Sequence, residues 1–208
     1  MNKAIVFDLD GTLWDSRKQV SKCWENLGKK LFGDFFKMSS SFLESQMGKT
    51  MAEIENDIRD TYKLSEEQIK KFSSLAFDEE VKYLQRHPGV LYPNLIETIE
   101  DIKRKGYKVF ICSNCQSGYI ETFLNLLPEE LFDDHICFGD TKQEKYISLL
   151  EILTRNCIDF AYFVGDTEKD YEAAMKAHVY FIHATYGFGK VNKCYASIDS
   201  LKDLSELF

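Results

Sequence analysis

A short run near the start of the chain constrains the fold more than any other stretch of the sequence. Residues 4–7 are all apolar, and the lack of alternation indicates a short strand that is covered on both faces. Asp8 and Asp10 follow at the end of this strand, where a spacing of two residues turns both carboxylates to the same side. Gly11 then permits a tight turn, and Thr12 adds a hydroxyl group. Because two neighbouring like charges repel, this pair of acids requires a cation or a shared proton.

The remaining sequence divides into a helical stretch and a stretch in which strands and helices alternate. Residues 16–85 have apolar side chains at spacings of three and four, with two capping boxes, and no strand pattern. Later apolar runs predict four further buried strands, at residues 107–112, 136–138, 160–164 and 179–182. We therefore predict an α/β fold, a Rossmann-like doubly wound parallel sheet with an inserted α-helical cap. In this prediction the core consists of residues 1–15 and 86–208, and the cap of residues 16–85.

Composition and charge argue against several classes of partner. The chain has 208 residues and a net charge of -8, whereas nucleic acids and anionic membranes bind basic patches. No apolar run approaches the roughly 20 residues of a membrane-spanning helix, and the first residues do not resemble a signal peptide. The six cysteines are scattered, mostly in apolar contexts, as is typical of reduced thiols in the cytosol. We expect a cytoplasmic protein that binds neither nucleic acid nor a membrane.

Further candidate site residues lie at or just beyond the ends of predicted strands. Ser113 and Asn114 follow the second predicted strand, and Asp166 follows the fourth. Asp170 lies one helical turn after Asp166. Because open parallel sheets bind ligands beyond the carboxyl ends of their strands, we expect these groups to meet Asp8 there. Carboxylates at such a place suit a hard cation with oxygen ligands, which points to Mg²⁺.

Two stretches resemble the first and fourth motifs of the haloacid dehalogenase-like (HAD) hydrolases: Asp8-x-Asp10-Gly11-Thr12-Leu13-x-Asp15 and Gly165-Asp166-Thr167-Glu168-Lys169-Asp170. Most members of that family are phosphatases that pass through an aspartyl-phosphate intermediate. The resemblance implies that Asp8 is the nucleophile and that Asp10 is the general acid and base. It also implies a Mg²⁺ ion held by Asp8, Asp166 and Asp170, with Asp10 contributing its backbone carbonyl.

The same resemblance assigns the residues that bind the phosphate of a small phosphorylated metabolite. Thr12, Ser113 and the neighbouring Asn114 match polar groups that contact phosphate oxygens in the family. A lysine of the third motif holds the phosphate and the nucleophile. Lys142 precedes x-Glu, as in some family members, and is the preferred candidate, although the pattern leaves Lys145 open as the alternative.

Other interpretations remain open on the sequence. Asp8 and Asp10 can belong to a plain Asx turn, Ser113 can cap a helix, and Lys142 can be a solvated residue at a helix start. Cys112 and Cys115 form a C-x-x-C pair, but neither a thioredoxin-like context nor a second pair for zinc accompanies it. Haloacid dehalogenases lack the second aspartate, so the presence of Asp10 argues against dehalogenation. A sugar phosphomutase of the same family and a non-catalytic HAD-like binding domain are the remaining alternatives.

Overall fold

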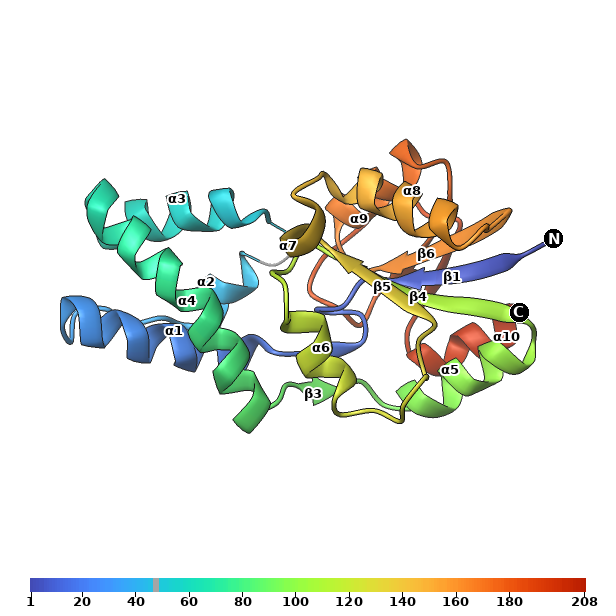
Figure 1. Cartoon of the computed structure of the whole chain (residues 1–208), viewed down its shortest axis with the longest axis horizontal. Coiled ribbons are helices and arrows are strands. Elements are labelled where there is room, and N and C mark those ends of the chain that lie inside the picture. Colours follow the sequence, from blue (N-terminus) through green and yellow to red (C-terminus); the bar gives the residue numbers. More distant parts are fainter. Residues whose placement is uncertain (47–48) are drawn as a thin grey trace. The chain divides into compact units, whose positions relative to one another are not determined.

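The structure is a computed structural model that describes residues 1–46 and 49–208. The chain divides into two units (Figure 1). One unit consists of Met1–Asp15 and Val90–Phe208, and the other consists of Ser16–Gly89. The first unit is therefore built from two pieces of the chain, and the second unit is an insertion between them.

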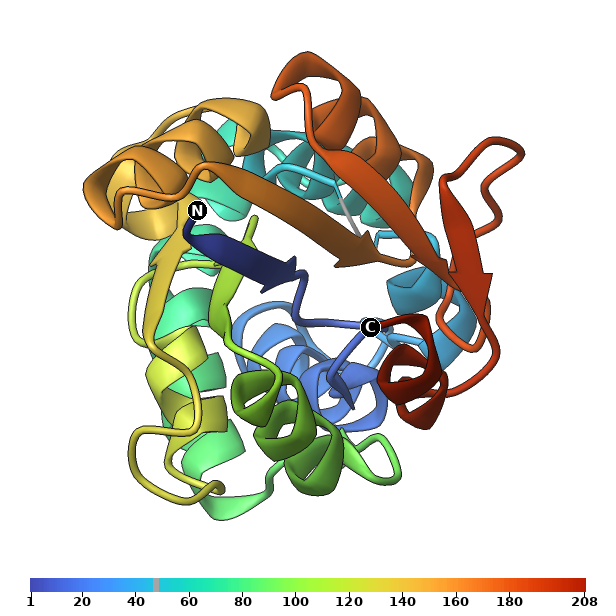
Figure 2. The same cartoon turned by 90° about the vertical axis from the view of Figure 1, so that its right-hand side faces the viewer.

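A parallel sheet lies at the centre of the first unit (Figures 1 and 2). Its strands are β1 Lys3–Phe7, β4 Tyr107–Ser113, β5 Asp134–Cys137, β6 Phe160–Gly165, β7 Tyr180–Ala184 and β8 Ala196–Ile198. They lie in the order β5-β4-β1-β6-β7-β8, and every neighbouring pair is parallel. Because β1 lies between β4 and β6, with helices over both faces, its residues 4–7 are fully buried and all apolar.

Helices cover both faces of this sheet (Figure 2). Helix α8 (Lys145–Arg155) packs against β4 and β5, and α9 (Glu168–Lys176) packs against β6 and β7. On the opposite face, α5 (Leu95–Arg104) packs against β4, together with the 3₁₀ turn η1 (Leu201–Asp203) and helix α10 (Leu204–Leu207). This arrangement confirms the predicted α/β class with a doubly wound parallel sheet.

The shortest elements of the first unit were not expected from the sequence. Strands β2 (Trp14–Asp15) and β3 (Val90–Leu91) form an antiparallel ribbon, and β8 extends the edge of the sheet. Helix α6 (Tyr119–Leu124) is also shorter than the apolar pattern suggested. Elements of two or three residues are too short to have a recognisable hydrophobic period, so the pattern cannot reveal them.

The helix expected to begin at Lys142 begins instead at Lys145. A short helix, α7 (Phe138–Thr141), precedes it and ends at Lys142, which has a left-handed backbone conformation with φ 57°. Such a conformation commonly terminates a helix. Glu144 then occupies the N-cap position of α8. The chain therefore changes direction between the two lysines, and they do not share one helix.

The second unit is helical among its described residues. Its helices are α1 Arg17–Phe32, α2 Ser40–Glu44, α3 Met51–Tyr62 and α4 Glu66–Arg86. Both predicted capping boxes are present, because Thr50 accepts a hydrogen bond from the backbone N–H of Glu53 and Ser65 accepts one from that of Gln68. Helices α1 and α4 pack against each other. Among their buried groups, Trp24 Nε1 donates to Glu80 Oε2 at 2.5 Å.

Candidate active site

Three buried carboxylates gather beyond the carboxyl ends of the central strands. Asp8 directly follows β1, Asp166 directly follows β6, and Asp170 lies in the first turn of α9. One carboxylate oxygen of each lies within 4.8 Å of those of the other two. Because β1 and β6 are parallel neighbours, their ends deliver the first two side chains to the same edge of the sheet.

The ammonium group of Lys145 lies between two of these acids. Its Nζ is 2.5 Å from Asp8 Oδ1 and 2.5 Å from Asp170 Oδ1, and its side chain is buried. Lys145 reaches them from the inner face of α8, which it shares with Leu149 and Ile152. The group thus combines three carboxylates with one ammonium, and it has a surplus of negative charge.

Burial and mutual repulsion shift the pKa values of Asp8 and Asp166. Burial, and then the charges of Asp170 and Asp166, raise the pKa of Asp8 well above its ordinary value, against the pull of Lys145. Burial and the charge of Asp170 raise the pKa of Asp166 to about 7. For Lys145, burial lowers the pKa, but the two neighbouring carboxylates outweigh it and raise the pKa. The single ammonium group of Lys145 therefore does not balance the negative charge of the three carboxylates.

The hydrogen bonds of the acids differ, and the difference decides which of them suit a cation. Both oxygens of Asp170 accept hydrogen bonds, Oδ1 from Lys145 and Oδ2 from the backbone and hydroxyl of Thr167. Asp166 Oδ2 accepts from the backbone N–H of Phe188 at 2.7 Å, whereas its Oδ1 is buried without a hydrogen-bond partner in the described part of the chain. A buried oxygen without a donor, next to other carboxylates, fits a hard divalent cation such as Mg²⁺.

Asp10 lies at the same edge of the sheet, two residues beyond Asp8. It is half-buried, and its Oδ1 accepts a hydrogen bond from the Tyr119 hydroxyl at 3.0 Å. A turn fixes the backbone there, because the N–H of Gly11 donates to the carbonyl of Trp14 at 2.9 Å. Tyr119 had no signal in the sequence, since a tyrosine at the start of a helix matches no motif.

The three polar residues assigned to phosphate binding occupy different environments. Thr12 is fully buried, and its Oγ1 has no hydrogen-bond partner among residues 1–46 and 49–208. Ser113 ends β4, two residues beyond the pair formed by Ile111 and Phe7, so it lies next to the end of β1. Asn114 follows it and is half-buried. The positions of Thr12, Ser113 and Asn114 do not test whether these residues contact phosphate, so their phosphate-binding roles stay predictions.

Lys145, and not the preferred Lys142, lies among the carboxylates. Lys142 is exposed, and its Nζ lies 5.6 Å from the centre of the Phe138 ring. The preference for Lys142 failed because it relied on the string around the lysine. The hydrophobic period of α8 does not separate the two lysines, because residue 142 would fall on the same face as residues 145 and 149 in a continuous helix.

In the part of the chain that the structure describes, Cys112 and Cys115 form no disulfide and belong to no group that could hold a metal ion. All six cysteines are free, and Cys112 and Cys115 are buried. Burial raises the pKa of Cys112 to about 12 and also raises that of Cys115. Both groups are therefore neutral thiols at ordinary pH, whereas thiolates are needed for metal binding and for nucleophilic attack.

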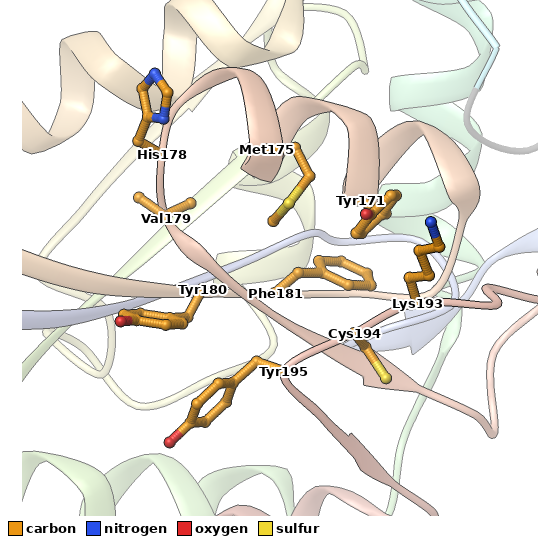
Figure 3. A pocket seen from close by; sticks show the side chains of 9 residues that line it. All are labelled: Tyr171, Met175, His178, Val179, Tyr180, Phe181, Lys193, Cys194 and Tyr195. Atoms are coloured by element: carbon orange, nitrogen blue, oxygen red, sulfur yellow. The ribbon is translucent and has the colours of Figure 1, made fainter.

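A cavity of about 470 Å³ lies elsewhere in the first unit (Figure 3). Helix α9 lines one side, and the start of β7 and the segment before β8 line the other. Its lining residues are Tyr171, Met175, His178, Val179, Tyr180, Phe181, Lys193, Cys194 and Tyr195. The set includes no member of the carboxylate group, so this cavity is not part of the candidate site.

Comparison with known proteins places the chain among hydrolases. A family model described as haloacid dehalogenase-like hydrolase matches residues 5–184. A phosphoglycolate phosphatase of Aquifex aeolicus is 30% identical over 196 residues, which cover 91% of this chain and 88% of that protein. A phosphoglycolate phosphatase of Neisseria gonorrhoeae is 28% identical over 200 residues, with 90% and 81% covered.

Solved structures share the fold. The crystal structure of a predicted phosphoglycolate phosphatase from Haemophilus somnus 129pt matches with a TM-score of 0.85, and the match covers 99% of this chain and 97% of that one. At 21% sequence identity, this likeness concerns the fold alone. Among the described residues, no helix combines the length and the apolar character needed to cross a membrane.

Proposed function

Because the chain belongs to the haloacid dehalogenase-like hydrolase family and is a phosphatase of that family, we propose that it hydrolyses a small phosphomonoester through an aspartyl-phosphate on Asp8. The observation that carries this proposal is the position of Asp8. Its carboxylate lies at the end of the central strand, within the acidic group and in contact with Lys145. A carboxylate held in this way attacks the phosphorus atom and displaces the alcohol.

In this proposal Asp10 handles the protons. It donates a proton to the leaving oxygen in the first step and accepts one from the attacking water in the second. The Tyr119 hydroxyl, 3.0 Å from Asp10 Oδ1, supports the assignment because it fixes the direction of that carboxylate. Asp8 cannot serve both purposes, since it is itself esterified after the first step.

Asp8 and Asp166 would hold the Mg²⁺ ion, together with the backbone carbonyl of Asp10. The bound ion neutralises the repulsion between the nucleophile and the anionic substrate. We assign Asp170 a supporting part, because both of its oxygens already accept hydrogen bonds from Lys145 and Thr167. Lys145 then binds the transferring phosphoryl group while it also orients Asp8.

We propose phosphoglycolate as the first substrate to test, because the relatives with 30% and 28% identity are phosphoglycolate phosphatases. The inserted unit, Ser16–Gly89, is proposed to be a cap that contacts the part of the substrate beyond the phosphate. Its position supports this role, since it follows the motif that contains Asp8 and Asp10 directly in the sequence.

The test compares phosphoglycolate with p-nitrophenyl phosphate as substrates for the purified protein. We expect hydrolysis of both to stop in EDTA and to return when excess Mg²⁺ is added. Asp10→Asn should retain more activity on the nitrophenyl ester than on phosphoglycolate, because nitrophenolate leaves without a proton. Full activity in the chelator would contradict the metal assignment, and equal losses on both esters would contradict the role of Asp10.

A further inference from the structure

The segment after β7 contacts Asp166 closely. In the loop of residues 186–189, the backbone N–H of Phe188 donates to Asp166 Oδ2 at 2.7 Å. The backbone of Gly189 contributes a second hydrogen bond to the same carboxylate. Asp166 Oδ1 remains buried without a hydrogen-bond partner in the part of the chain that the structure describes.

Three glycines lie close to Asp166. A Cβ atom on Gly187 would lie 2.2 Å from Asp166 Cβ and 2.6 Å from its Oδ2. One on Gly189 would lie 2.5 Å from the Asp166 carbonyl oxygen, and one on Gly11 would lie 2.3 Å from Oδ2. No real Cβ approaches neighbours so closely, so any side chain at these positions must displace Asp166 or the backbone.

At two of these positions, the lack of space for a side chain explains the glycine better than the backbone conformation does. Gly11 has φ +84°, a conformation that other residues rarely adopt. Gly187 and Gly189 are not among the residues with positive φ, so their backbone accepts an ordinary residue. Their lack of a side chain therefore serves the close approach to Asp166.

A further hydrogen bond ties the loop to the first motif. The hydroxyl of Tyr186 donates to the carbonyl of Thr12 at 2.8 Å. The Tyr186 ring also packs edge-on against Tyr92, with 4.7 Å between the ring centres. The loop is thus fixed to the turn that contains Asp10 and Gly11, and a Cβ atom on Gly187 would also lie 2.6 Å from the Gly11 carbonyl oxygen.

We propose that residues 186–189 form a positioning loop that holds Asp166 through Oδ2 and presents Oδ1 to the divalent cation. The proposal rests on the metal site of the proposed function and adds to it the element that orients the ligand. Groups that orient a metal ligand in this way typically change the affinity for the metal when they are altered.

The test measures Mg²⁺ binding by isothermal titration calorimetry, without substrate. Gly187→Ala should raise the Mg²⁺ dissociation constant about 10- to 100-fold, because the added methyl group moves Asp166. Gly106→Ala is the matched control. It introduces alanine at φ +85°, but its Cβ meets nothing within 4 Å, so it should lower the melting temperature and leave Mg²⁺ binding unchanged.

A second pair of variants covers the case in which Gly187→Ala fails to fold. Tyr186→Phe removes only the hydroxyl and should weaken Mg²⁺ binding about tenfold, at the lower end of the same range. Tyr62→Phe is its control, because the Tyr62 hydroxyl donates to the carbonyl of Lys37 at 2.7 Å in the inserted unit.

The outcomes separate the two proposals. Mg²⁺ dissociation constants within twofold of the wild type in the folded loop variants would overturn the positioning role and leave the proposed function intact. A wild-type protein that shows no Mg²⁺ binding would instead overturn the metal site itself, and the positioning role with it. Weaker binding in the loop variants but not in their controls supports the proposal.

Discussion

Two aspartates of one sheet have opposite surroundings, one on the edge strand β5 and one just beyond the central strand β1. At the amino end of β5, Asp134 accepts four hydrogen bonds, two from Arg155 and one each from Asn156 and the backbone of His135. At the carboxyl end of β1, Asp8 shares a single ammonium group with Asp170 and faces Asp166. The first acid has a surplus of donors, and the second belongs to a group with a surplus of acids.

The pKa values follow this difference. Burial raises the pKa of Asp134, but the hydrogen bonds from Arg155 and Asn156 outweigh it and lower the pKa. Burial raises the pKa of Asp8, and the charges of two further carboxylates add to that rise. An acid with several donors is typical of a structural role, whereas a crowded group of acids is typical of a site that binds a cation. The comparison therefore predicts which acid supports folding and which supports the reaction.

The same substitution at Asp8 and at Asp134 should separate activity from stability most strongly. Asp8→Asn should lower kcat by about 10⁴-fold or more, since an amide does not replace the nucleophile. Asp134→Asn should leave kcat within about twofold, since Asp134 lies on the edge strand β5 and does not belong to the group of Asp8, Asp166 and Asp170. Steady-state hydrolysis of p-nitrophenyl phosphate checks both variants, and circular dichroism confirms that they fold. Comparable losses of kcat would contradict the division.

A second comparison concerns the two lysines, with a smaller expected effect. Lys145→Met keeps the apolar stem but removes the charge between Asp8 and Asp170, so kcat/KM should fall about 10²- to 10³-fold. Lys142→Met makes the same change at an exposed side chain and should leave kcat/KM within about twofold. A large loss at Lys142 with little change at Lys145 would restore the preference based on the sequence alone.

These two lysines show how far the sequence predicts the site. The sheet was predictable, because residues 4–7 and the later apolar runs have the lengths and compositions of buried strands, although β5 ends at Cys137 and β7 at Ala184 where the sequence predicted 138 and 182. The meeting of Asp8, Asp166 and Asp170 followed from the parallel order. The identity of the buried lysine could not be predicted in this way. It depends on where α8 begins, and the left-handed backbone of Lys142 sets that point.

The loop of residues 186–189 was harder to predict than the lysine. The glycines at positions 187 and 189 were visible in the sequence, but glycine in a loop is ordinary and indicates no partner. Only the tertiary structure brings this loop against Asp166. A backbone N–H that donates to a carboxylate has no residue type, so no sequence motif can encode it directly.

The smallest expected effect concerns the free energy of unfolding at low pH. Asp134 has a lowered pKa in the folded protein, so it binds fewer protons there than in the unfolded chain near pH 4. Its contribution is complete above its unfolded pKa of about 3.9 and is lost as the pH falls through the folded value. The side chain is 28% exposed, so its hydrogen bonds should contribute about 1–2 kcal/mol to the free energy of unfolding.

Urea unfolding of Asp134→Asn measures this contribution. At pH 7 the variant should be about 1–2 kcal/mol less stable than the wild type, because an amide accepts fewer hydrogen bonds from Arg155. The difference should shrink as the pH falls below about 4, since the wild-type carboxyl then becomes protonated. Asp78→Asn, at an exposed position of α4, controls for the change in net charge. A deficit that grows toward low pH would show that Asp134 is protonated more readily in the folded protein, and the contrast between Asp134 and Asp8 would then fail.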